Sequence, residues 1–117
     1  MVEKIKNIVV FVKDIKAARR FYREQLGLPA GQETEYMMEF LPTEGTALGV
    51  SLAMHEAAQK LVGRHTGITF TVKGLEELYA RLTKEGVRFT EPLEKSPWGK
   101  MAVVADPDGN EFALVEM

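Results

Sequence analysis

The chain has 117 residues, the size of one small domain or of two half-domains that share a core. A chain of this length buries about two-thirds of the surface that its unfolded state exposes, which is enough to fold without covalent cross-links. It contains no cysteine, so disulfide bonds, thiolate metal sites and cysteine nucleophiles are excluded. The 15 basic and 17 acidic residues give a formal charge of -2 and form no long run of one sign. This balance predicts no nucleic-acid partner.

The sequence predicts neither a membrane segment nor an export signal. The longest aliphatic run, residues 8–12, is far too short to span a bilayer. The first residues lack the charged, apolar and small-residue pattern of a signal peptide. We therefore expect a cytoplasmic protein with no membrane partner.

The first part of the chain is typical of a strand and a helix followed by three strands. The alternating stretch NIVVFV predicts the first strand. Asp14 is a candidate N-cap for a helix whose apolar residues recur at helical spacing as far as Leu26, and Gly27 suits the left-handed exit. An extended piece near residues 28–33 and the segments YMMEFL and GTALGVSLAM, with a turn at Pro42 and Gly45, predict the remaining strands.

The second part of the chain repeats this order. GITFTVKGLEELYARLTKEGV aligns with NIVVFVKDIKAARRFYREQLGL at an offset of 60 residues. Its helix uses Leu75, Leu78 and Leu82 and ends at Gly86. An extended piece at residues 87–91 follows, and then the segments GKMAVVA and EFALVEM flank the turn DPDGN. Residues 55–64 have no counterpart, and we interpret them as a connector with a helical turn.

The sequence therefore predicts a single α+β domain built from two βαβββ modules, residues 1–54 and 65–117, joined by the connector 55–64. A four-stranded sheet with one helix leaves its second face uncovered. We expect the modules to pair into one curved mixed sheet, a cup with the helices outside. Its hollow suits a small ligand.

Taken together, these segments resemble the vicinal oxygen chelate superfamily, which includes glyoxalase I, extradiol dioxygenases, fosfomycin-resistance proteins and bleomycin-resistance proteins. The matching pieces are VFVKDIKAARRFYREQLGL, GITFTVKGLEELYARLTKEGV, PWG at 97–99 and DPDGN at 106–110. They span nearly the whole chain in the expected order. The resemblance implies the glyoxalase/bleomycin-resistance-like fold.

The resemblance also locates the family's metal ligands. In metal-using members, four ligands, typically His, Gln or Glu, point into the cup from the first and last strand of each half. Carried over by position, they fall at Asn7, Gly49, Gly67 and Ala113. Only the Asn7 amide is a donor, and a weak one, whereas a divalent ion needs several fixed donors. We therefore expect the metal-free, bleomycin-resistance-like type, with no cofactor and no catalytic residue.

Strand alternation predicts the lining of the cup. The inward positions are occupied by small, neutral or hydroxylated residues with one aromatic: Asn7, Val9 and Phe11; Gly67, Thr69 and Thr71; Gly49 and Ser51; Ala113 and Val115. Two interpretations stay open. The set leaves room for a ligand, or aromatic residues from other strands or from a partner subunit fill the space as ordinary core.

Side chains from the remaining segments complete the predicted ligand-binding set or its rim. The parity of residues 36–41 is open, so the residues that face the cup are either Tyr36, Met38 and Phe40 or Met37, Glu39 and Leu41. An inward Glu39 is a lone acid or base, and an outward one is a solvated edge-strand residue. Trp98 either stacks on a planar ligand or closes a core or a subunit interface. His65 is either an off-register ligand at the rim or a surface histidine.

Three functions compete on this evidence. The first is a metal-free protein that encloses a hydrophobic or planar small molecule, as antibiotic-sequestering relatives do. The alternative is a metal-dependent lyase, isomerase or dioxygenase with ligands recruited from His65, Glu39, Glu111 or Glu116. The third is an interaction module whose sheet serves dimerisation. We predict a homodimer, because two-module relatives commonly form one.

Overall fold

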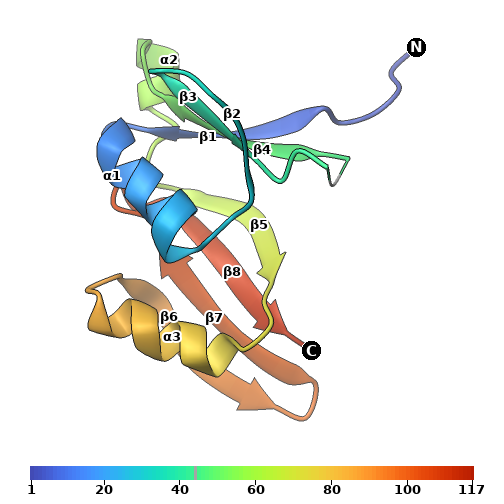
Figure 1. The fold of residues 1–117 in the computed structure, drawn as a ribbon, viewed down its shortest axis with the longest axis vertical. Coiled ribbons are helices and arrows are strands. Elements are labelled where there is room, and N and C mark those ends of the chain that lie inside the picture. Colours follow the sequence, from blue (N-terminus) through green and yellow to red (C-terminus); the bar gives the residue numbers. More distant parts are fainter. Residues whose placement is uncertain (44) are drawn as a thin grey trace. The chain divides into compact units, whose positions relative to one another are not determined.

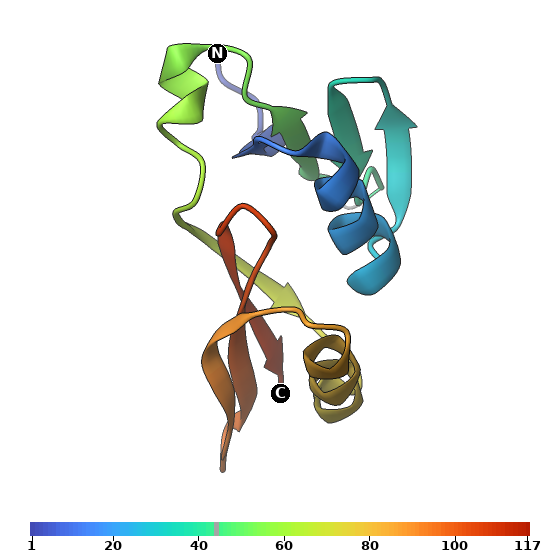
Figure 2. The same cartoon turned by 90° about the vertical axis from the view of Figure 1, so that its left-hand side faces the viewer.

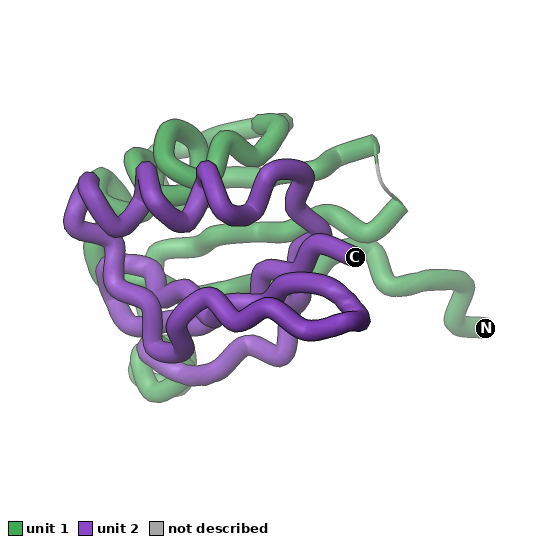
Figure 3. Tube along the Cα trace, turned by 90° about the horizontal axis from the view of Figure 1, so that it is seen from below, with its two compact units in different colours: residues 1–62 green, residues 63–117 purple. Residues whose placement is uncertain are grey.

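The computed structural model describes residues 1–43 and 45–117 and divides into two compact units. Unit 1 is Met1–Val62 and unit 2 is Gly63–Met117 (Figure 3). The described strands form two four-stranded mixed sheets, one within each unit (Figure 1). The predicted α+β class and the repeated βαβββ order are confirmed. The joining of both sheets into one cup stays a prediction, and residue 44 of the predicted Pro42–Gly45 turn lies outside the described residues.

Unit 1 begins with β1 (Asn7–Val12), α1 (Ile15–Arg19) and the π-helical segment η1 (Arg20–Gln25). It continues with β2 (Ala30–Glu33), β3 (Met37–Phe40), β4 (Ala47–Leu52) and the short helix α2 (Glu56–Gln59). The strand order is β1-β4-β3-β2, with β1 parallel to β4 and the other pairs antiparallel. As predicted, Asp14 caps α1: its carboxylate accepts a hydrogen bond from the Ala17 N–H at 3.1 Å.

The core of unit 1 lies between its sheet and the helix α1–η1. Val10, Val12 and Val50 alternate onto that sheet face and are buried there. The Tyr22 ring packs with its centroid 5.9 Å from that of Phe40. The predicted apolar stripe of this helix is Ile15, Ala18, Tyr22 and Leu26. Phe21 is also buried, because the helix widens into a π-turn closed by the Leu26 N–H donating to the Phe21 carbonyl. A wider turn changes which residues face the sheet.

Unit 2 contains β5 (His65–Thr71), α3 (Leu75–Lys84), β6 (Phe89–Ser96), β7 (Gly99–Ala105) and β8 (Glu111–Glu116). The order is β5-β8-β7-β6, with β5 parallel to β8. Helix α3 lies along one face of this sheet and buries Leu75 and Leu82 (Figure 2). Strand β6 runs further than the predicted 87–91, because an edge strand with shifted register tolerates Pro92, which has no N–H to donate.

The DPDGN turn between β7 and β8 is held together by hydrogen bonds of its buried Asp106 and Asn110 side chains. The Asp106 carboxylate accepts from the backbone N–H groups of Asp108 at 2.9 Å and Asn110 at 2.8 Å. The fully buried Asn110 accepts from the Gly63 N–H at 2.9 Å through its side-chain oxygen. The turn therefore fixes the start of unit 2 onto the β7–β8 hairpin.

No helix in 1–43 or 45–117 is long and apolar enough to cross a membrane.

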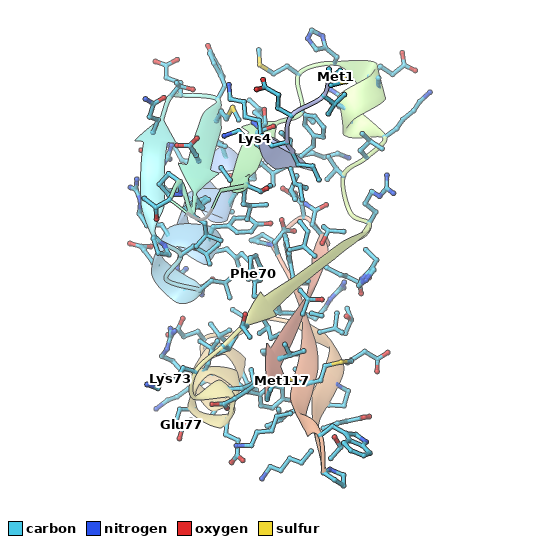
Figure 4. The ribbon with its side chains drawn as sticks, turned by 90° about the vertical axis from the view of Figure 1, so that its right-hand side faces the viewer. Met1, Lys4, Phe70, Lys73, Glu77 and Met117 are labelled. Carbon is cyan, nitrogen blue, oxygen red and sulfur yellow. The ribbon has the colours of Figure 1, made fainter. Side chains whose placement is uncertain are left out.

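Helix α3 is capped from outside by the last strand. Its first residues follow Gly74, which has no side chain to satisfy the free N–H groups. The Glu116 carboxylate of β8 accepts from the Gly74 N–H at 2.9 Å and the Leu75 N–H at 3.0 Å. Figure 4 shows Lys73 and Glu77 at this same end of α3. The two backbone donors hold the pKa of Glu116 below its ordinary value of 4.5.

We predict that the Glu116 cap stabilises unit 2 in a pH-dependent way. Because its folded-state pKa is lowered, the contribution is complete above the ordinary carboxyl pKa and is lost as the pH falls through the folded-state pKa. Glu116→Gln should lower the melting temperature by a few degrees at neutral pH. That difference should shrink when circular-dichroism melts are repeated at increasingly acidic pH.

Glu94→Gln is the matched control, because Glu94 lies on exposed β6 and takes no part in the cap. Its melting temperature should follow the native chain at every pH. A Glu116→Gln deficit that stayed constant into acid would mean that the side chain contributes through packing and not through its charge.

Candidate functional site

The candidate site is built on the sheet face turned away from α1 in unit 1 and from α3 in unit 2, here named the distal face. In unit 1, β1 and β3 both pair with β4, and alternation sends every second residue of these strands to this face. Register gives two full rows across the sheet. One row is Val9, Gly49 and Glu39, and the other is Phe11, Ser51 and Met37. Asn7 pairs with Ala47 at the end of the same face.

Gly49 lies at the centre of the unit 1 distal face, beneath a methionine. A Cβ atom added to Gly49 would meet the Met37 methyl carbon at 2.9 Å and a Val9 methyl carbon at 3.3 Å. These distances mean that the place of a side chain at residue 49 is already taken by its neighbours. Sequence reasoning did not include Met37 in the site, because the parity of β3 was open.

The parity of β3 follows from its buried residues. Met38 and Phe40 are each 1% exposed on the helix side, so Glu39 and Met37 lie on the distal face. The prediction that Phe40 lines the ligand-facing surface is therefore wrong: its ring packs on Tyr22, where apolar burial is greatest. Tyr36 lies in the bend before β3, outside both rows, and its carbonyl accepts from the Leu52 N–H.

Unit 2 repeats these rows with different side chains. One row is Thr69, Ala113, Val103 and Glu91, and the next is Thr71, Val115, Met101 and Glu94. Thr69 and Ala113 thus occupy the places that Val9 and Gly49 occupy in unit 1. The face has two hydroxyl groups along β5 and two carboxylates along the edge strand β6. Its centre is aliphatic.

A bulge brings a histidine beside a carboxylate at the end of the unit 2 distal face. The register between β5 and β8 shifts between His65 and Thr69, around Gly67. The Thr66 hydroxyl holds this bulge by donating to the Glu111 carbonyl at 2.7 Å and accepting from the Ile68 N–H. As a result His65 pairs with Glu111, and its Nδ1 lies 3.7 Å from the Glu111 carboxylate.

Strands β6 and β7 form a hairpin (Figure 1). Trp98 lies in its tip, between Ser96 and Gly99, and is 81% exposed. The Trp98 backbone N–H donates to the Ser96 hydroxyl at 3.2 Å, and that hydroxyl donates to the Gly99 carbonyl. The tip and the C-terminal residues Glu116 and Met117 surround an open hollow of about 480 Å³. An exposed indole beside a hollow is suited to stacking on a flat ligand.

Two lysines fasten the Trp98 hairpin to α3. Lys95 and Lys100 approach the same Glu76 carboxylate oxygen at 3.0 Å and 3.1 Å. Their hydrogen bonds hold the pKa of the Glu76 carboxyl below its ordinary value and raise the pKa of Lys100. The lysine charges are thus directed at the helix.

The donor set does not fit the metal centre that the family resemblance implies. Gly49 and Ala113 offer no donor atom in their side chains, and Gly67 lies in a bulge. Within the described ranges 1–43 and 45–117, no group of three or more His, Asp or Glu side chains is arranged to hold a metal ion. A divalent ion needs more fixed donors than these positions supply.

Comparisons with known proteins agree with the fold. Residues 4–114 match the model of the Glyoxalase/Bleomycin resistance protein/Dioxygenase superfamily. A crystal structure of a member of that superfamily from Sphaerobacter thermophilus DSM 20745 is 30% identical, with a TM-score of 0.78, covering 99% of this chain and 98% of that one. The uncharacterized protein YetH of Bacillus subtilis (strain 168) is 26% identical over 99% of this chain and 100% of its own.

A third similar protein has a named ligand class. TnmS3, an antibiotic binding protein from Streptomyces sp. CB03234, shares the fold with a TM-score of 0.72. It is 24% identical, and the match covers 98% of this chain and 96% of TnmS3. At this identity the likeness concerns the fold alone.

We predict that Gly99 is required for the position of Trp98. Its φ of 141° is unfavourable for other residues, and an added Cβ would lie 2.5 Å from the Glu116 carbonyl oxygen. Gly99→Ala should destabilise the fold by on the order of 3 kcal/mol, because the collision is with backbone. Urea unfolding measures this loss, and the tryptophan emission wavelength reports the altered tip.

Gly86→Ala is the control for backbone strain alone. Gly86 also has a positive φ, of 86°, but an added Cβ would meet nothing within 4 Å. This variant should lose about 1 kcal/mol and keep the native emission. Equal losses in the two variants would refute the role assigned to the Gly99 contact.

Proposed function

Because the chain belongs to the Glyoxalase/Bleomycin resistance protein/Dioxygenase superfamily, we propose that it binds a hydrophobic or planar small molecule without a bound metal ion. The observation that carries this proposal is the chemistry of four positions. Where metal-using relatives are expected to place donors, this chain has Asn7, Gly49, Gly67 and Ala113. Side chains that are small and uncharged provide room and apolar contact in place of coordination.

The distal faces support the apolar part of this proposal. In unit 1, Val9, Phe11 and Met37 surround Gly49, and all three make dispersion contacts without requiring a polar partner. In unit 2, Thr69 and Thr71 add hydroxyl groups that orient a ligand by hydrogen bonds. A few polar groups on a largely apolar surface are the usual composition of a small-molecule site.

Trp98 supports the planar part. Its indole is exposed for stacking at the tip of a hairpin whose flanking Lys95 and Lys100 are paired with Glu76 of α3. Antibiotic binding by TnmS3 shows that this fold is able to sequester a small molecule. We extend that activity to this chain on the strength of the distal-face chemistry.

One observation favours metal-dependent catalysis as the second candidate. His65 and Glu111 stand 3.7 Å apart on the unit 2 distal face, and each is a common ligand of Zn²⁺ or Fe²⁺. In the same unit, the Glu116 carboxylate is already engaged with α3. The His65–Glu111 pair would supply the first two ligands of such a site.

We predict that isothermal calorimetry against a panel of flat aromatic drugs and non-planar hydrophobic compounds will detect at least one ligand with micromolar or tighter affinity. Trp98 fluorescence should change on addition of the same compound. Trp98→Leu should weaken binding by about tenfold, since stacking on an aromatic ring contributes on the order of 1 kcal/mol. Indifference to the whole panel would sink the proposal.

Metal analysis of the purified protein separates the two candidates. Less than a tenth of an equivalent of Zn, Ni, Mn or Fe per chain, on the order of a contaminant level, is expected for a binding protein. One tightly held equivalent that is lost in His65→Ala and Glu111→Gln would favour the enzyme.

We also propose that the chain forms a homodimer. Ile5 and Ile8 leave an exposed apolar stretch at the N-terminal edge of unit 1, which a second subunit would cover at low energetic cost. Size-exclusion chromatography with light scattering should give twice the chain mass of 13.1 kDa at micromolar concentration. A monomeric mass under these conditions would contradict the proposal.

A further inference from the structure

The two units differ at one position of the distal face, and this difference affects which ligand each face accepts. Met37 and Met101 occupy equivalent places in the repeated rows, opposite Ser51 and Val115 respectively. Met37 is only partly exposed and reaches over Gly49, whereas Met101 is 47% exposed. In unit 2 the place of Gly49 belongs to Ala113, whose methyl group takes the space that a covering methionine would need.

The contact over Gly49 is close because the residue is glycine. The Met37 methyl carbon lies 2.9 Å from where a Cβ would be, which is a separation that real Cβ atoms do not tolerate. Met37 therefore fills the missing side-chain volume of Gly49 with its own flexible end. An unbranched thioether with three rotatable bonds moves aside more readily than any β-branched residue.

The surroundings of Gly49 suit a flat, uncharged surface. Val9 borders it on the β1 side, 3.3 Å from the Cβ position. On the β3 side the charge of Glu39 is drawn away, because its carboxylate lies over Gly31 and accepts weakly from the Gln32 N–H at 3.4 Å. With Met37 displaced, the exposed strip is a glycine backbone with aliphatic borders. Aromatic rings pack well over strand glycines.

We propose that Gly49 is the floor on which the ring of a flat aromatic ligand binds, and that Met37 is the cover it displaces. This inference rests on the proposed function and specifies its ligand as a planar, polycyclic aromatic molecule. Met37 turns aside and places its sulfur against the ring edge, a favourable contact. Unit 2 has Ala113 at the equivalent position and therefore no such floor, so the proposal concerns the distal face of unit 1 alone.

The test uses methionine methyl groups as reporters and anthraquinone-2-sulfonate, a soluble flat tricycle, as the probe. In protein labelled with ¹³C at the methionine methyls, the Met37 resonance should shift on titration because of the ring current, while that of Met101 should stay in place. Met37 and Met101 are assigned from Met37→Leu and Met101→Leu. The shift should saturate at the dissociation constant measured by calorimetry.

Variants test the floor itself. Gly49→Ala should weaken the probe by about tenfold, because the new methyl group occupies the contact surface. Met37→Leu should also weaken it, since a branched side chain clears the floor less easily, whereas Met101→Leu should bind as the native chain does. Circular dichroism checks that Gly49→Ala is folded. If it is not, the native Met37 shift and Met37→Leu still decide the matter.

The outcomes separate this inference from the function on which it rests. Binding of the probe with an unmoved Met37 resonance, or with full affinity in Met37→Leu, overturns the Gly49 floor and leaves small-molecule binding standing. Binding of non-planar compounds alone overturns the floor as well. Failure of every compound, planar or not, overturns both. A shift at Met101 in place of Met37 would assign the ring to unit 2.

Discussion

The pairing of β4 with β1 on one side and β3 on the other is the constraint on which unit 1 depends. Because the parallel and antiparallel ladders share one central strand, a single register decides which side chains meet the helix and which meet the distal face. Val50 goes to the helix side and Gly49 to the distal side, and a slip of one residue would exchange them. The register of β4 therefore determines both the core and the candidate site, and apolar burial against Tyr22 fixes that register.

This constraint explains which structural features could be predicted from the sequence. Alternation in β1 predicted that Ile8, Val10 and Val12 would meet the helix. Val10 and Val12 are buried there, whereas Ile8 near the start of the strand is 43% exposed. Helical spacing and the Asp14 cap predicted where α1 begins. The side of β3 was not readable, because Met37, Met38 and Phe40 are all apolar and alternation gives no contrast among them. Only packing on Tyr22 distinguishes them, and that contact joins residues far apart in sequence. No pattern in the sequence predicts the π-turn that buries Phe21.

The repeated units solve the same problems with different residues. Both helices begin after a strand and need partners for their first N–H groups. Unit 1 uses the side chain of Asp14, whereas in unit 2 the equivalent place is Gly74 and the Glu116 carboxylate arrives from β8. The Glu116 cap ties α3 to β8, the last strand of the sheet. The β6–β7 hairpin that carries Trp98 is paired with the same helix, so α3 supports both. A local alignment of the two halves therefore predicts the elements but not the contacts that hold them.

The closing segment of the chain shows why scaffold and chemistry vary independently in this fold. Hydrogen bonds of the Asp106–Asn110 turn join its own residues to one another and to Gly63. Strand β8 is therefore presented in the same register whatever residue stands at 113. Alanine there removes a donor without cost to the fold, because Phe112 and Leu114 on the other side carry the packing. A fold whose turns and core are satisfied without the residue at 113 places no structural demand on its side chain, so that side chain can vary with function while the scaffold is kept.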